Sequence, residues 1–191
     1  MAVILASGSP RRRELMEMLK VSDLKIIPAK GEECPPEGAG PEETVKALAR
    51  AKCAEVGALA AAEDTVVAAD TIVWFDGKIY GKPHSEQEAF EMLTALSGAT
   101  HEVYTGVAVL AGGEIHVEAE RTLVHFREIP AEEIRAYIAT GEPMDKAGAY
   151  GVQSLGALLV ERIDGDFYNV MGLPVEKLGQ CLTKHFGVRF F

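Results

Sequence analysis

Apolar residues recur along the chain with two different spacings, and stretches of one spacing alternate with stretches of the other. Short runs rich in Val, Ile and Ala are typical of strands, and apolar residues three and four apart predict helices between them. Strands are expected at residues 3–5, 26–27, 65–75, 78–80, 103–110, 114–126, 158–163 and 167–171. Helices are expected from Pro10, at about 41–61, from Ser85 to Gly98, at 131–140 and from Pro174. Tight-turn signals such as Asp76-Gly77 join several neighbouring strands, so the pattern predicts an α/β fold with a mixed, twisted sheet and flanking helices.

The predicted helix at 41–61 carries a lysine on its apolar face. That face is formed by Val45, Leu48, Ala49, Val56 and Leu59. At 100° per residue, Lys52 points within about 20° of the direction of Val45. A lysine on an apolar face either extends its ammonium group to solvent or meets an anion; extension to solvent is the commoner outcome, so the spacing alone is a weak signal of a site.

The first predicted strand leads into a polar turn and a basic helix start, Ser7-Gly8-Ser9-Pro10-Arg11-Arg12-Arg13. A helix N-terminus presents unpaired N–H groups to an anion, and hydroxyl and guanidinium groups add further donors for phosphate oxygens. Cations at this end oppose the helix dipole, so a bound anion would compensate for them. We therefore interpret the segment as a phosphate site; the alternative is an N-cap followed by a solvated basic turn.

Asp70 lies in the middle of the apolar strand 65–75. A buried carboxylate is costly unless it is paired, hydrogen-bonded or close to a cation. At a strand end that opens into a cleft, a carboxylate can bind a metal or act as a base. We favour such a role for Asp70 over a purely structural salt bridge.

Two further polar segments contain candidate binding residues. Lys82 lies in the rigid loop Gly81-Lys82-Pro83, where an anion contact and a solvated turn lysine explain it equally well. The glycine-rich stretch from Met144 to Ser154 has no clear period, and such a loop inside a compact domain is usually functional or mobile. Within it, Gln153 offers both donors and an acceptor, as recognition of a nucleobase edge requires.

Composition restricts the possible partners. The 191 residues include 19 basic and 29 acidic side chains, so the net charge is −10 and argues against binding a nucleic acid polymer or an anionic membrane. A few clustered cations can still bind a small anion. Three scattered cysteines without a CxxC motif predict a reducing compartment, and the absence of a signal peptide or long apolar run points to the cytoplasm. The length fits one domain, residues 1–191, which can divide into two lobes.

The chain resembles the Maf family of nucleoside triphosphate pyrophosphatases over essentially its whole length. The motifs that carry the resemblance are Ser7-x-Ser9-Pro10-Arg11-Arg12-x-Glu14-Leu15, Ala69-Asp70-Thr71, Gly81-Lys82-Pro83, Leu96-Ser97-Gly98, Asp145-Lys-Ala-Gly-Ala-Tyr-Gly-Val-Gln153 and Gly172-Leu-Pro174. The resemblance implies a two-lobed Maf/ITPase-like fold with a central cleft, a homodimer, and a requirement for a divalent metal cation, Mg²⁺ or Mn²⁺.

The resemblance also implies roles for individual residues. Asp70 would be the proton acceptor, and the triphosphate would be held by Ser7, Arg12, Lys52 and Lys82. Glu33, which the residue pattern alone presents only as a loop charge, would lie near the metal together with Asp70.

Three positions bear on the choice of base. The branch of the family that acts on 7-methyl-GTP carries Trp at the position of Arg11 and Glu at the position of Gln153. An aromatic ring suits a cationic methylated purine, and a carboxylate accepts from the two donors of guanine. Gln153 matches instead the O4 and N3–H edge that uracil and thymine share, so Arg11, Thr71 and Gln153 resemble the dTTP/UTP branch.

The expected activity is hydrolysis of dTTP and UTP, or of a modified pyrimidine nucleotide, to the monophosphate and pyrophosphate. Asp70 would activate the attacking water. Two alternatives stay open: a 7-methyl-GTP pyrophosphatase, and a non-catalytic nucleotide sensor that regulates a partner such as the septation machinery.

Overall fold

The computed structural model describes residues 2–21 and 23–188, so the predicted domain 1–191 includes positions outside the described residues (1, 22 and 189–191). The chain divides into two compact units, in agreement with the two lobes that the resemblance implies. The first unit comprises Met1–Asp70, Thr105–Glu120 and Gly172–Phe191, and the second comprises Thr71–Tyr104 and Arg121–Met171.

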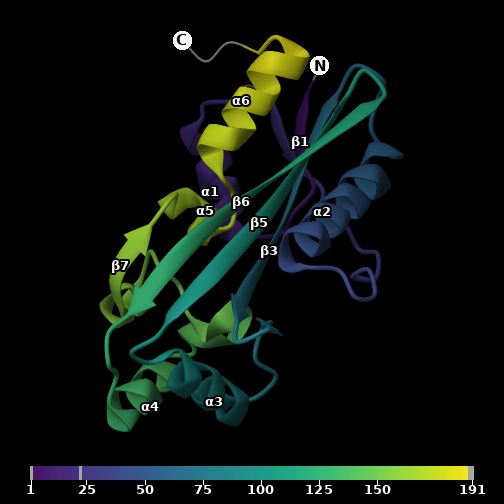
Figure 1. Ribbon diagram of the computed structural model, residues 1–191. Helices are drawn as coiled ribbons and strands as arrows, with labels where there is room; N and C mark the ends of the chain where they lie inside the picture. The colour runs from purple at the N-terminus through teal and green to yellow at the C-terminus, as the bar shows by residue number, and fades with distance from the viewer. Residues whose placement is uncertain (1, 22, 189–191) are drawn as a thin grey trace. The chain divides into compact units, whose positions relative to one another are not determined.

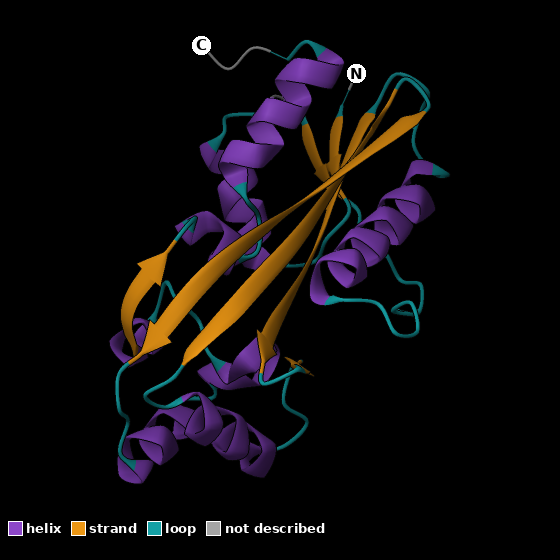
Figure 2. Cartoon of the chain, in the orientation of Figure 1, coloured by secondary structure: helices purple, strands orange, loops and turns teal. Residues whose placement is uncertain are grey.

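The elements alternate as the sequence pattern predicts (Figures 1 and 2). The strands are β1 (Val3–Leu5), β2 (Leu24–Ile26), β3 (Thr65–Phe75), β4 (Lys78–Tyr80), β5 (Thr100–Ala111), β6 (Glu114–Phe126) and β7 (Val160–Asp164). The helices are α1 (Pro10–Met18), α2 (Pro41–Gly57), α3 (Glu86–Leu96), α4 (Ala131–Ala139), α5 (Phe167–Met171) and α6 (Val175–Phe186). Three short 3₁₀ helices follow α4: η1 (Glu142–Asp145), η2 (Ala147–Ala149) and η3 (Leu155–Leu159).

The sheet is mixed, as predicted. Its strands follow the order β2-β1-β3-β5-β6-β7, and β4 pairs with β3 outside this path. The strand β1 is parallel to both β2 and β3, whereas the pairs β3–β4 and β6–β7 are antiparallel. At the β3–β4 turn, both Asp76 and Gly77 have positive φ (49° and 73°), as the Asp-Gly signal predicts for a tight hairpin.

The core of the first unit forms where α2 packs on one face of the strands. Side chains two residues apart share a face of a strand, so alternate residues of β1 and β3 meet the helix. The resulting cluster consists of Ile4, Ala6, Ala49, Cys53, Val56, Val66, Ala68 and Ala108. Figure 1 shows α2 on one side of these strands and α1 and α6 on the other. Because Asp70 has the same parity as Val66 and Ala68 along β3, its side chain belongs to the face that α2 covers.

Gly106 in β5 permits this close approach of α2. A Cβ atom at position 106 would lie 2.2 Å from the carbonyl oxygen of Val45 and 2.5 Å from its carbonyl carbon, both of which are helix backbone. We expect Gly106→Ala to lower the free energy of unfolding by about 2 kcal/mol, because the helix would have to move. Urea denaturation measures this loss. Gly81→Ala, where a Cβ would meet nothing within 4 Å, is the control, and equal stability of the two variants would refute the packing argument.

The core of the second unit forms between the strands and the helices α3 and α4, which run side by side in Figure 1. It includes Val73, Leu93, Leu96, Val103, Val124, Phe126, Ile134, Tyr137 and Tyr150. Ser85 begins α3 as predicted, since its side chain accepts a hydrogen bond from the N–H of Glu88. The Glu88 carboxylate accepts a hydrogen bond from the N–H of His84, the residue before the N-cap, at 2.7 Å.

Two of the sequence predictions for the elements are wrong. The segment 167–171 is the short helix α5 and not a strand, because the Asp166 side chain accepts a hydrogen bond from the N–H of Tyr168 at 2.7 Å and caps a helical turn. The helix predicted to reach residue 61 ends at Gly57, and Leu59, assigned to its apolar face, is 74% exposed. The three cysteines are free thiols. Among the described residues, no helix has the length and apolarity to cross a membrane.

Candidate active site

The turn after β1 places a hydroxyl group and a guanidinium group together. Ser7 follows the buried end of β1 and is itself 7% exposed. Its Oγ accepts hydrogen bonds from the N–H of Ser9 and from Nη1 of Arg12, both at 3.2 Å. Pro10 begins α1, and Ser9 takes the N-cap position without a side-chain capping bond. The two predicted phosphate ligands Ser7 and Arg12 are therefore in direct contact.

Arg12 is held on a second side by Gly172, which is not among the predicted site residues. Nε of Arg12 donates to the carbonyl oxygen of Gly172 at 2.7 Å, across 160 positions of the sequence. Gly172 has φ of 111°, a conformation that favours glycine. The sequence signal for this contact is the Gly172-Leu-Pro174 motif, from which the residue pattern alone predicts no role. With two fixed hydrogen bonds, the guanidinium has a defined orientation.

Arg12 interacts electrostatically with Asp70 of β3 and with two other charged residues. Burial lowers the pKa of the Arg12 guanidinium from its ordinary value, and the negative charge of Asp70 acts in the opposite direction. The positive charge of Arg11 and the negative charge of Glu33 have smaller, opposing effects on the same pKa. Four of the predicted site residues thus share one electrostatic environment, and Arg12 stays cationic because guanidinium groups do not deprotonate in proteins.

Lys52 is the centre of a second cluster. Its Nζ lies 2.5 Å from Oδ1 of Asp70 and 2.7 Å from Oε1 of Glu33. The lysine and aspartate side chains are 18% and 8% exposed, whereas Glu33 is 59% exposed. Of the two readings of Lys52, the structure supports the one in which the lysine meets an anion. The pair also has the geometry of the salt bridge that is the alternative role of Asp70.

The paired carboxylates bear on the predicted metal. Mg²⁺ is usually bound by one or two carboxylates together with water and substrate phosphate oxygens. Glu33 and Asp70 both form an ion pair with the ammonium group of Lys52, so one oxygen of each carboxylate lies close to the same positive charge. Within residues 2–21 and 23–188, no three His, Cys, Asp or Glu side chains are grouped to hold a metal ion. Two neighbouring carboxylates match the number that Mg²⁺ takes from a protein when water and phosphate oxygens supply its other ligands.

The remaining predicted residues belong to the second unit. Lys82 is exposed in the loop after β4, and the carbonyl oxygen of the preceding Gly81 accepts a hydrogen bond from the N–H of Gly148 at 3.1 Å. This bond joins the Lys82 loop to η2, within the glycine-rich segment. Gln153 is exposed between η2 and η3, and Thr71 lies in β3 directly after Asp70.

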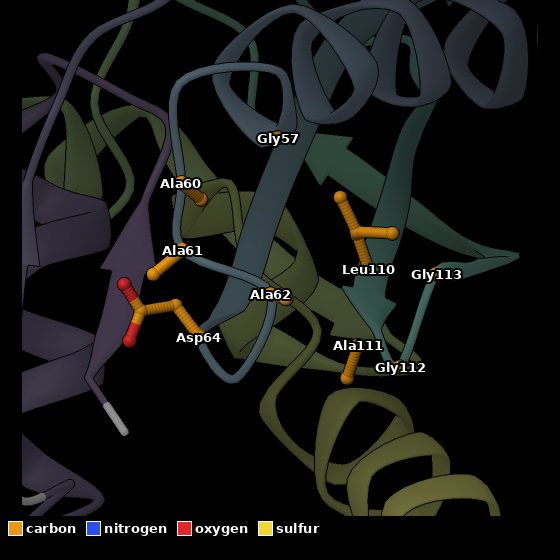
Figure 3. Close-up of a pocket in the computed structure, with 9 residues that line it drawn as sticks. All are labelled: Gly57, Ala60, Ala61, Ala62, Asp64, Leu110, Ala111, Gly112 and Gly113. Carbon is orange, nitrogen blue, oxygen red and sulfur yellow. The ribbon is translucent and has the colours of Figure 1, made fainter.

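A separate pocket lies away from these residues in the first unit (Figure 3). It has a volume of about 410 Å³ and is lined by Gly57, Ala60, Ala61, Ala62, Asp64, Leu110, Ala111, Gly112 and Gly113. Its one charged side chain, Asp64, accepts a hydrogen bond from the N–H of Ala2 at 2.7 Å. None of the predicted site residues is among the nine, so this pocket does not coincide with the candidate site.

The model of the Maf-like protein family matches residues 2–185 of this chain. The chain belongs to the Maf family. A dTTP/UTP pyrophosphatase of Bacillus cereus strain AH187 is 49% identical over 176 residues, which cover 92% of this chain and 91% of the relative. A dTTP/UTP pyrophosphatase of Thermococcus kodakarensis is 50% identical over 175 residues, covering 91% of this chain and 92% of the relative. These matches confirm the membership of the Maf family that the sequence motifs predict.

The fold agrees with a more distant solved structure. A HAM1 protein from Coxiella burnetii aligns with a TM-score of 0.51 and 17% identity, over 96% of this Maf chain and 99% of that chain. At this level of identity the likeness concerns the fold alone. Together with the mixed sheet and flanking helices, it confirms the predicted fold class.

Proposed function

We propose that this Maf protein hydrolyses dTTP and UTP to the nucleoside monophosphate and pyrophosphate. The observation that carries the proposal is the cluster in which Lys52 joins the buried Asp70 to Glu33, within the electrostatic field of Arg12. Relatives about half identical over nine-tenths of the chain are dTTP/UTP pyrophosphatases, which supports the same substrates here.

In this proposal Asp70 is the general base. Its carboxylate accepts a proton from water, the water oxygen forms a bond to the α-phosphorus, and the bond from that phosphorus to the α–β bridging oxygen breaks. The leaving group is pyrophosphate, whose developing negative charge Arg12 and Lys52 offset. The hydroxyl of Ser7, already in contact with Arg12, adds a donor for the same phosphates.

Glu33 and Asp70 are the residues that would hold the divalent cation, Mg²⁺ or Mn²⁺. When bound, such an ion neutralises phosphate charge and polarises the reacting phosphorus. We assign Lys82 to the phosphates and Arg11, Thr71 and Gln153 to the choice of base, on the resemblance of their motifs to the dTTP/UTP branch. A homodimer is likewise proposed from that resemblance.

Pyrophosphate release is the deciding measurement. With Mg²⁺ or Mn²⁺ present, we expect kcat/KM for dTTP and UTP to exceed the values for ATP, GTP and 7-methyl-GTP by about 100-fold, as follows from assigning Arg11, Thr71 and Gln153 to the choice of a pyrimidine base. EDTA in excess of the metal serves as the negative control. Preference for 7-methyl-GTP would contradict the assignment of Arg11 and Gln153, and tight dTTP binding without pyrophosphate release would show a sensor in place of an enzyme.

A further inference from the structure

Glu142, which the proposed function does not use, is the centre of a hydrogen-bond network in the second unit. It begins η1, which is separated from the end of α4 by Thr140 and Gly141. Its carboxylate accepts hydrogen bonds from the hydroxyl of Tyr137 at 2.8 Å, the hydroxyl of Ser154 at 2.7 Å, and the backbone N–H groups of Leu155 at 3.2 Å and Gly156 at 3.1 Å. One side chain therefore binds the segment that follows Gln153 at three consecutive residues.

The other side of Gln153 is attached to the same network through Tyr137. The Tyr137 hydroxyl accepts a hydrogen bond from the N–H of Gly151 at 3.1 Å, while it donates to Glu142. A Cβ atom at position 156 would lie 2.6 Å from this hydroxyl and 2.7 Å from the carbonyl oxygen of Gly151, so the backbone packs tightly here. Gln153 is thus the exposed middle of a short segment whose two ends are both fixed.

The network is charged, which makes it stronger than a set of neutral contacts. Partial burial raises the pKa of Glu142, but the hydrogen bonds from Ser154, Tyr137 and the backbone outweigh this and hold the pKa below its usual value. At neutral pH the side chain is a carboxylate, and hydrogen bonds to an ionised acceptor are roughly twice as strong as neutral ones. Glutamine at this position would instead turn two N–H donors toward a set of donors.

Fixing the backbone around Gln153 matters for a reason specific to an amide. Uracil presents an acceptor at O4 and a donor at N3, whereas cytosine presents a donor at N4 and an acceptor at N3. A glutamine amide turned by 180° exchanges its oxygen and nitrogen and complements the other base equally well. Discrimination between the two pyrimidines therefore requires a defined amide orientation, and a loosely held loop would lose it.

We propose that Glu142 is a positioning residue that holds the segment 151–156 and thereby lets Gln153 select uracil and thymine over cytosine. This inference rests on the proposed function, in which Gln153 reads the base. It predicts that Glu142→Gln lowers the ratio of kcat/KM for UTP to kcat/KM for CTP by about 10-fold, mainly through a higher KM for UTP. Steady-state pyrophosphate release with both nucleotides measures the ratio.

Glu132→Gln is the matched control. Glu132 lies exposed in the first turn of α4, in the same unit, and the substitution removes the same charge. We expect it to leave the UTP/CTP ratio within about twofold of the unmodified protein. Tyr137→Phe, which keeps the ring and removes the hydroxyl from both Glu142 and Gly151, should lower the ratio in the same direction. If Glu142→Gln does not fold, the single variants Tyr137→Phe and Ser154→Ala provide the same test.

A double-variant cycle separates positioning from general damage. In a Gln153→Ala background there is no amide left to orient, so Glu142→Gln should not change the UTP/CTP ratio further. A further drop of about 10-fold in that background would overturn the inference. If Gln153→Ala lowers the ratio and Glu142→Gln does not, the positioning role fails and the base-reading role stands. If Gln153→Ala leaves the ratio unchanged, the base-reading role in the proposed function fails, and the inference fails with it.

Discussion

Asp70→Asn is expected to lower kcat for dTTP hydrolysis by about 1,000-fold, with a much smaller change in KM. Asparagine has nearly the same shape, and its amide oxygen can still accept a hydrogen bond from Nζ of Lys52, which lies 2.5 Å from Oδ1 in the unmodified protein. The amide cannot take a proton from water, so the variant removes the proposed base and keeps the surrounding contacts. Initial rates of pyrophosphate release at saturating dTTP measure the effect.

Asp64→Asn is the matched control for this substitution. Asp64 lies just before β3, six positions from Asp70, and its carboxylate accepts a hydrogen bond from the backbone N–H of Ala2. We expect it to change kcat by less than about twofold. Full activity of Asp70→Asn would remove Asp70 from the mechanism. Loss of stability without loss of kcat in the folded fraction would leave the Lys52–Asp70 pair as a structural salt bridge.

The Lys52–Asp70 pair also shows what a single sequence can predict. Lys52 and Asp70 are candidate site residues for the same physical reason: each is a charged side chain at a position where the local pattern predicts a buried apolar one. A buried charge requires a partner, and the two unusual positions supply each other's partner. Strand parity explains the contact afterwards, since Asp70 lies on the face of β3 that α2 covers. The sequence predicts that a buried Asp70 needs a partner and allows either solvent or an anion for Lys52, but it does not predict the register that joins the two residues.

Contacts made by irregular segments were beyond the sequence argument. Glu33 lies in a loop without period, so nothing in its neighbourhood distinguished it from the other acidic residues before its contact with Lys52 was known. The local sequence does not distinguish Glu142 either, because its partners lie in α4 and in the glycine-rich segment. Such contacts depend on chain topology, which local spacing does not encode.

The two wrong element predictions have a common physical origin. Residues 167–171 have a strand-like composition, and residues 58–61 continue a helix-like one, so each was assigned from composition at a boundary. Local hydrogen bonds explain both differences. The Asp166 side chain caps a helical turn at 167–171. At the end of α2, the N–H groups of Leu59 and Ala60 donate to the carbonyl oxygens three residues earlier, those of Val56 and Gly57, in place of the i−4 bonds of an α-helix. By contrast, the tight turn at Asp76-Gly77 requires positive φ, a condition that residue type does reveal.

Lys52→Met is expected to lower kcat/KM for dTTP by about 100-fold or more, the effect of removing one preorganised electrostatic contact from an active site. Methionine retains much of the length and the apolar stem of lysine, so the packing of α2 is preserved while the positive charge disappears. The loss leaves Asp70 buried without its cation and still close to Glu33. A fall of about 2 kcal/mol in the free energy of unfolding should accompany it. Pyrophosphate release and urea denaturation measure the two effects.

Lys46→Met controls for the loss of a lysine from the same helix. Lys46 forms an exposed pair with Glu42 one turn away, a type of contact that contributes little to stability, so activity should stay within about twofold. The combination Lys52→Met with Asp70→Asn gives the sharper test. Because the double variant holds neither charge of the pair, it should regain part of the stability that Lys52→Met loses, while its kcat falls no further than that of Asp70→Asn. Additive losses in both quantities would mean that Lys52 and Asp70 act separately, and that the ion pair is not the unit on which catalysis depends.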